Sequence, residues 1–142
     1  MYFDLKIYND AIEIFHKSIA LYKNLNPTAT YAYSYYYLGI CYVAKSNFVD
    51  AKTCFDQTQS IFDELKITDT AEILTLQRGI ISKSIGNSEE ASTIFKTIIA
   101  KPDSPVILNA KAEALCQIGT IEATKDRYNL ALNYLNKALQ LN

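Results

Sequence analysis

Several residue types are absent or rare in this sequence of 142 residues. It has no tryptophan, one histidine, three prolines and four glycines. The glycines are scattered, so the sequence contains no glycine-rich phosphate-binding loop. No apolar run approaches the roughly 20 residues that a membrane-spanning helix needs, and we expect no membrane partner. His16 has no nearby cysteine or carboxylate cluster with metal-ligand spacing, so we expect no metal site and interpret His16 as a surface or boundary residue.

Charge and cysteine content narrow the class of protein further. With 14 basic and 15 acidic side chains the net charge is −1, which gives no general attraction for nucleic acid, and we expect none to bind. Cys41, Cys54 and Cys116 form no CxxC pair, and the start of the chain is charged too early for a secretory signal. We therefore expect reduced thiols in the core and a cytoplasmic location. Nothing indicates catalysis, so we expect no enzyme activity and no cofactor.

A period of forty residues organises the rest of the sequence. Gly39 recurs as Gly79 and Gly119, Ala51 recurs as Ala91 and Ala131, and Phe55 recurs as Phe15, Phe95 and Leu135. Spacing of this kind is the signature of one supersecondary unit stacked on itself. The pattern predicts a half repeat at 1–26 and repeats at about 29–66, 69–101 and 104–142, which together form a single domain.

Apolar residues spaced by three and four predict helices throughout, and no segment alternates with period two. We expect residues 1–7 to be the tail of a helix. Seven helices should follow: five at 8–25, 29–45, 48–65, 89–100 and 128–141, a fourth in chain order that ends near residue 85, and a sixth that ends near residue 124. Thr68 and Asp69 are predicted to cap the fourth of these helices, and Ser104 followed by Pro105 is predicted to begin the sixth. The predicted fold is all-α, with about seven helices.

The second repeat matches the tetratricopeptide pattern best. Tyr35 stands at the tryptophan position, Leu38 and Gly39 at the leucine-glycine pair, and Tyr42 at the tyrosine position. The sequence therefore resembles the tetratricopeptide repeat (TPR) family, although that family's repeats usually span about 34 residues. The resemblance implies a right-handed α-solenoid of antiparallel helix pairs. HEAT-type repeats also have periods near forty and are the alternative fold, but they lack the spacing of twelve residues from glycine to alanine.

In the resemblance, the first helix of each pair lines a concave groove, and equivalent positions give the candidate contacts. These are Tyr33, Tyr36, Tyr37, Ile40, Ile73, Leu76, Gln77, Ile80, Glu113 and Gln117. Gln77 and Gln117 hold the same position in successive repeats, where amides can satisfy a peptide backbone. The segment 29–45 has six tyrosines and one charged residue, and either its neighbours bury these rings or the rings form a recognition surface.

Two further expectations concern the whole protein. The array begins inside a repeat and ends on a leucine-rich helix, which indicates a fragment of a longer protein or a homodimer formed through the open ends. The period and the tyrosine- and asparagine-rich composition also resemble, more weakly, the sensor domains of Rap/PlcR-type peptide-pheromone receptors. That resemblance implies a regulator that binds an extended apolar peptide. The alternative is a structural scaffold that mediates protein-protein or self-association.

Overall fold

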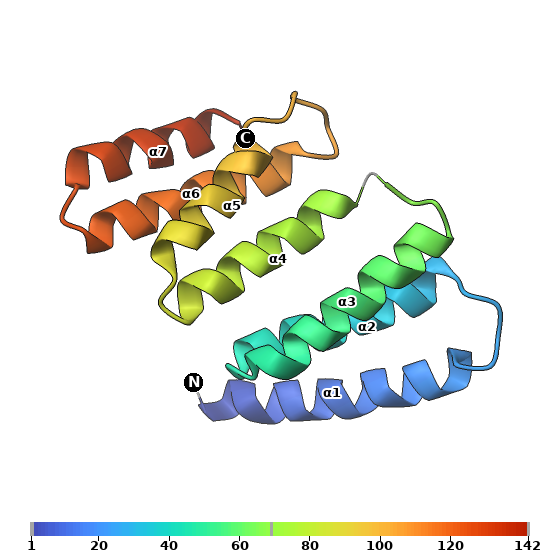
Figure 1. Cartoon of the computed structure of the whole chain (residues 1–142). Helices are drawn as coiled ribbons and strands as arrows, with labels where there is room; N and C mark the ends of the chain where they lie inside the picture. The colour runs from blue at the N-terminus through green and yellow to red at the C-terminus, as the bar shows by residue number, and fades with distance from the viewer. Residues whose placement is uncertain (1, 69, 142) are drawn as a thin grey trace. The chain divides into compact units, whose positions relative to one another are not determined.

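The computed structural model describes residues 2–68 and 70–141, excluding the side chains of residues 2–5. Over these residues the chain forms seven α-helices and no β-strand, which confirms the predicted all-α class (Figure 1). The chain divides into two compact units, Met1–Thr68 (unit 1) and Asp69–Asn142 (unit 2). The boundary between the units falls between the repeats predicted at 29–66 and 69–101.

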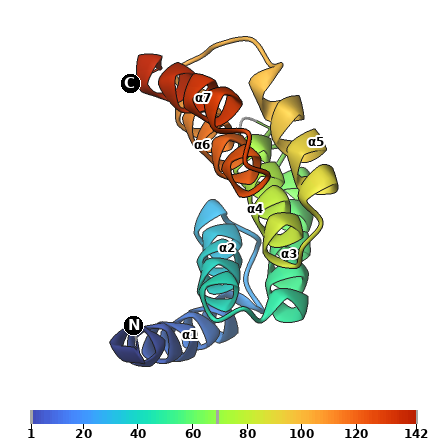
Figure 2. The same cartoon turned by 90° about the vertical axis from the view of Figure 1, so that its left-hand side faces the viewer.

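Unit 1 contains three helices: α1 (Tyr2–Tyr22), α2 (Ala29–Ala44) and α3 (Phe48–Glu64). Helix α2 packs against both α1 and α3, as both views show (Figures 1 and 2). The hydroxyl of Thr28 caps α2 by accepting a hydrogen bond of 3.2 Å from the N–H of Tyr31. Cap residues satisfy amide groups that the first helical turn leaves open. The predicted start of a helix at residue 29 is confirmed.

Unit 2 contains four helices: α4 (Ala71–Ser84), α5 (Ser88–Ile99), α6 (Leu108–Thr124) and α7 (Tyr128–Gln140). Helix α5 packs against both α4 and α6, and α6 packs against α7 (Figure 2). These helices enclose one cluster of buried apolar residues: Leu76, Ala91, Phe95, Ile98, Ile107, Ala110, Ala114, Ile118 and Ile121. Burial of these apolar side chains is the main favourable contribution to the stability of unit 2.

Three predicted helix starts differ from the structure. Helix α1 runs unbroken from Tyr2, so the predicted separate tail at 1–7 is wrong. Helix α4 begins after Thr70, which is its N-cap residue, so the predicted cap at Thr68 is wrong; the other predicted cap, Asp69, lies outside the described residues. Helix α6 begins at Leu108, so the predicted start at Pro105 is wrong: the carbonyl of Ser104 instead accepts bonds from the N–H groups of Ile107 and Leu108, which close a turn ahead of the helix.

The turn inside each helix pair repeats every forty residues. Residues 45–47, 85–87 and 125–127 join α2 to α3, α4 to α5 and α6 to α7. The middle residue of each turn has a positive φ: 60° at Ser46, 96° at Gly86 and 61° at Asp126. The N–H of the next residue reaches back to the last turn of the preceding helix, in the bonds Asn47 to Tyr42 (2.8 Å), Asn87 to Ser82 (2.8 Å) and Arg127 to Glu122 (3.0 Å). Such bonds satisfy carbonyl groups at a helix end, so the repeat in sequence is also a repeat in backbone geometry.

The repeated glycines lie where two helices of a pair approach closely. A Cβ atom on Gly39 would lie 2.6 Å from Cε1 of Phe55, and one on Gly79 would lie 2.5 Å from Cε1 of Phe95. Carbon atoms at optimal separation are about 3.5–4.0 Å apart. The rings of Phe55 and Phe95 are almost completely buried, with 1% and 0% of their surface exposed. The phenylalanine ring thus packs directly on the glycine of the preceding helix, which explains why these residue types recur together.

Candidate binding site

The predicted contacts on unit 1 form a compact aromatic group on α2, called here the α2 tyrosine face: Tyr33, Tyr36 and Tyr37. The rings of Tyr33 and Tyr37 stack with their centroids 6.2 Å apart, and the ring of Tyr36 meets that of Tyr37 edge-on at 5.2 Å. Tyr37 is 49% exposed, whereas Tyr33 and Tyr36 are half-buried. Ile40, the fourth predicted contact of α2, is also half-buried.

Phenylalanines from the neighbouring helices hold this face in place. Phe15 of α1 stacks on Tyr37 with centroids 6.1 Å apart. From α3, Phe62 meets Tyr33 at 5.5 Å and Phe55 meets Tyr36 at 5.8 Å. Offset and edge-to-face arrangements at such distances are favourable for aromatic pairs. The three tyrosines are therefore fixed by packing and still present part of their surface.

The structure also answers the question that the sequence left open about the six tyrosines of α2. None of them is fully buried, and Tyr37 is the most exposed. A tyrosine with a packed ring and an accessible hydroxyl loses little conformational freedom when a partner binds, which is one reason why tyrosine is enriched at interfaces.

The predicted contacts on α4 divide into packing residues and accessible ones. Leu76 belongs to the core of unit 2 with 9% of its surface exposed, and Ile80 packs against that core. Little of Leu76 is available to a ligand. Ile73 and Gln77 are half-buried and present part of their side chains to the surface of unit 2.

On α6 the predicted contacts Glu113 and Gln117 take part in a polar network. The ammonium group of Lys83, on α4, donates to the side-chain oxygen of Gln117 (2.8 Å) and to the hydroxyl of Thr120 (2.6 Å). The amide nitrogen of Gln117 in turn donates to Glu113 (2.8 Å). Burial lowers the pKa of Lys83, and the negative charge of Glu113 opposes that shift. The network joins α4 to α6, and both ends of the Gln117 amide are engaged in it.

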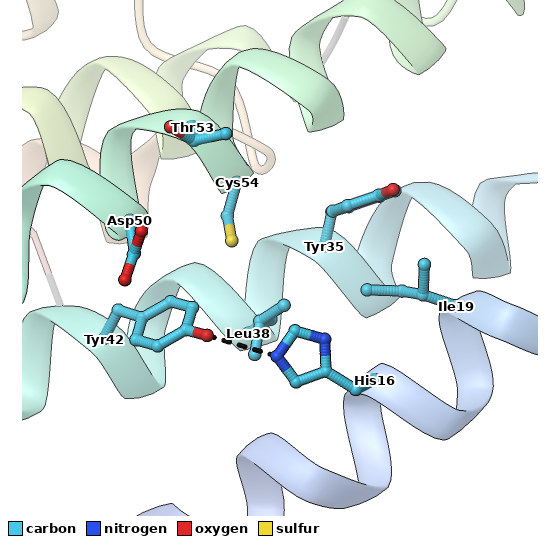
Figure 3. Close-up of a pocket in the computed structure, with 8 residues that line it drawn as sticks. All are labelled: His16, Ile19, Tyr35, Leu38, Tyr42, Asp50, Thr53 and Cys54. Atoms are coloured by element: carbon cyan, nitrogen blue, oxygen red, sulfur yellow. Dashed lines mark hydrogen bonds between the residues drawn. The ribbon is translucent and has the colours of Figure 1, made fainter.

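A cavity on unit 1 was missed by the sequence analysis (Figure 3). It has a volume of about 280 Å³ and is formed by all three helices of the unit. Its lining residues are His16 and Ile19 of α1, Tyr35, Leu38 and Tyr42 of α2, and Asp50, Thr53 and Cys54 of α3. The sequence contained one signal for it, because Cys54 is small where the residue eighty positions later, Tyr134, is large.

Two groups lining the cavity have raised pKa values. Burial, and to a smaller extent the negative charge of Asp50, raise the pKa of the Cys54 thiol to about 11. Burial and the neighbouring Tyr31 raise the pKa of Tyr35 to about 12. Both groups are therefore neutral at pH 7, and Cys54 is a poor nucleophile there because the thiolate is the reactive form.

The different burial of Cys54 and Cys116 predicts the order in which their thiols are alkylated. Cys54 is buried and its thiol stays protonated at pH 8, whereas Cys116 is only partly buried. We expect iodoacetamide to modify Cys116 of the folded protein well before Cys54, as followed by mass spectrometry of tryptic peptides over time. In denaturant the two rates should become similar. Equal rates in the folded protein would contradict the buried position of Cys54.

Other kinds of site are not seen in the part of the chain that the structure describes. Among residues 2–68 and 70–141, no group of three or more His, Cys, Asp and Glu side chains is placed to hold a metal ion. No helix over the same residues combines the length and the apolar character needed to cross a membrane.

Comparison with known proteins adds no family assignment. No protein-family model matches the chain, and no curated protein matches it significantly. Any function must therefore be argued from the residues themselves.

Proposed function

We propose that this chain is a protein- or peptide-binding module, built as a TPR-like right-handed solenoid, whose α2 tyrosine face contacts an extended apolar segment of its partner. The repeated turns and the repeated contacts of glycine with phenylalanine support the choice of a repeat architecture. The further proposal that the module is the sensor of a cytoplasmic bacterial regulator rests on the weaker resemblance to peptide-pheromone receptors.

One observation carries the binding proposal. Tyr37 is 49% exposed although its ring is stacked on Phe15 and held by Tyr33 and Tyr36. A rigid, partly exposed aromatic group suits recognition, because less conformational entropy is lost when it contacts a partner. Tyrosine is also among the residue types that contribute most to measured binding energies.

Unit 2 has a separate part in the proposal. Ile73, Gln77, Glu113 and Gln117 are accessible enough to contact a partner. Because Gln117 is bonded to Lys83 and Glu113, a peptide backbone would have to replace those bonds or use the remaining lone pairs of the amide oxygen. The contribution of Gln117 to affinity is therefore expected to be smaller than that of Tyr37.

The test is a matched pair of substitutions. A peptide is first selected from a displayed library of short, unstructured sequences, and its affinity is measured by fluorescence anisotropy. Tyr37→Ala is expected to weaken binding by about 5–30-fold, which corresponds to about 1–2 kcal/mol for a central aromatic contact. Tyr128→Ala removes a tyrosine that is 61% exposed on α7 and should leave the affinity unchanged. If the two substitutions had equal effects, the α2 tyrosine face would not be the binding site.

The alternative, a scaffold that associates with itself, is favoured by a different observation. Ile14 on α1 is 63% exposed, whereas Cys54, forty residues later in the same repeat position, is 5% exposed. On α7, Leu132 and Leu139 are 58% and 70% exposed. Exposed apolar surface of this kind is typical of interaction sites. A mass in light scattering that rises with protein concentration, and that Ile14→Glu returns to the monomer value, would support self-association; a constant monomer mass would exclude it.

A further inference from the structure

The cavity of unit 1 can be understood by comparing two sets of three helices. Helix α2 packs between α1 and α3 in unit 1, and α6 packs in the same way between α5 and α7 in unit 2. Residues eighty positions apart are equivalent in the two sets. Leu38 corresponds to Ile118, and Cys54 corresponds to Tyr134.

Tyr134 indicates what fits at the equivalent position. Its ring packs against the core cluster of unit 2, which contains Ile118. In unit 1 the equivalent residue is Cys54, a much smaller side chain, and the cavity lies beside it (Figure 3). Unit 1 therefore has a space where the equivalent helix of unit 2 has a phenol ring, whereas the other two copies of this position are Ile14 and Ile94.

The size of the cavity agrees with this comparison. A dry, engineered cavity of about 150 Å³ is large enough to hold benzene, and the volume here is about 280 Å³. Leu38 and Ile19 supply apolar surface, and the rings of Tyr35 and Tyr42 stand on either side of Leu38 in the close-up (Figure 3). Such surroundings favour a flat, apolar ring.

Polar groups also line the cavity. The hydroxyl of Tyr42 and Nε2 of His16 share a hydrogen bond of 3.1 Å. The carboxylate of Asp50 accepts one bond from the side chain of Asn47 (2.7 Å). Because an ionised carboxylate has about four lone-pair sites, Asp50 retains capacity to accept a hydroxyl proton from a ligand.

We propose that this cavity binds a phenol-class ring, meaning a six-membered aromatic ring with a hydroxyl group. The ring lies over Leu38 in the space beside Cys54, and its hydroxyl donates to Asp50. The source of the ring is either a free phenol or the tyrosine side chain of a partner. The site shares no residue with the α2 tyrosine face, so it stands independently of the function proposed above.

The first experiment is a titration of the folded chain with p-cresol, followed by NMR. His16 is the only histidine, so its ring signals report on the cavity without ambiguity. We expect saturable shifts of these signals with p-cresol. Toluene, which lacks the hydroxyl, should bind about tenfold more weakly. Absence of a saturable shift with p-cresol would overturn the proposal.

Two variants test the position of the ring. Cys54→Tyr should fill the cavity as Tyr134 does in unit 2, and should abolish binding while circular dichroism shows the helices intact. Asp50→Asn replaces the carboxylate that is proposed to accept the hydroxyl and should remove the preference for p-cresol over toluene, whereas Asp63→Asn, on the same helix, should keep it. The second comparison does not depend on whether Cys54→Tyr folds. An unchanged preference in Asp50→Asn would overturn the assignment of the hydroxyl contact.

N-acetyltyrosinamide distinguishes the two sources of the ring. Binding of this compound with an affinity close to that of p-cresol would indicate a tyrosine side chain of a partner. Binding of p-cresol alone would indicate a free phenol. Either result supports a phenol-class site, whereas failure of both compounds to bind would refute it.

Discussion

Replacing Phe95 with alanine should lower the free energy of unfolding of unit 2 by about 3–5 kcal/mol, the range measured for phenylalanine in protein cores. Phe95 has no exposed surface, belongs to the core cluster of unit 2 and packs on Gly79. Its removal deletes the buried ring and leaves a cavity that the surrounding helices can close only in part. Urea denaturation followed by circular dichroism measures the loss, and unprotected amides of α4 and α5 in hydrogen exchange would report complete unfolding of the unit.

The matched control is Phe15→Ala, at the copy of this repeat position that lies on α1. Phe15 is only half-buried and has no preceding glycine-bearing helix in the described chain. We therefore expect a smaller loss of about 1–2 kcal/mol, within the usual range for partly buried positions. Equal losses at the two positions would mean that burial against the glycine of the preceding helix does not set the contribution of this ring.

Replacing Gly79 with alanine should also destabilise unit 2, by up to about 2 kcal/mol. The new Cβ would lie 2.5 Å from Cε1 and 2.8 Å from Cζ of Phe95, whose ring is completely buried. Overpacking of this kind costs about 1–3 kcal/mol, and the preference of alanine over glycine in a helix offsets about 1 kcal/mol of it. Thermal or urea denaturation of the variant measures the net change.

Gly119→Ala is the control, because its Cβ would lie 3.1 Å from Cγ of the half-buried Leu135 and 3.3 Å from the backbone oxygen of Ala131, which are longer distances than those at Gly79. At residue 119 the higher helix propensity of alanine should outweigh the cost of the closer contact. The variant should therefore be as stable as the wild type or slightly more stable. The double variant Gly79→Ala/Phe95→Leu should lose less stability than the sum of the losses of the two single variants. A destabilising Gly119→Ala together with a neutral Gly79→Ala would contradict this account of the repeated glycines.

The helical class and most helix positions were predictable because they depend on local sequence. Apolar spacing marks each helix, and the turns after α2, α4 and α6 recur at one period. The start of α6 was not predictable in the same way, because Ser104 followed by Pro105 is a good local helix start. The structure instead uses the Ser104 carbonyl to close a turn, so that α6 begins three residues later.

The candidate site was less predictable, because exposure depends on residues distant in the sequence. Leu76 and Gln77 are neighbours in the sequence, yet one is in the core and the other is only half-buried. The bonds from Lys83 to Gln117 and Thr120 join residues on two helices. No local pattern shows that the side chains of Gln117 and Thr120 meet the half-buried ammonium group of Lys83. The same holds for the cavity that three helices form.

Hydrogen exchange over residues 31–43, with and without a library-selected peptide, tests the central claim most directly. If the α2 tyrosine face is the binding site, the amides of this segment should become more protected with peptide, while residues 128–140 of α7 should not change. Loss of the added protection in Tyr37→Ala would locate the contact at that side chain. Protection confined to α7, or no change in 31–43 at saturating peptide, would contradict the proposed function.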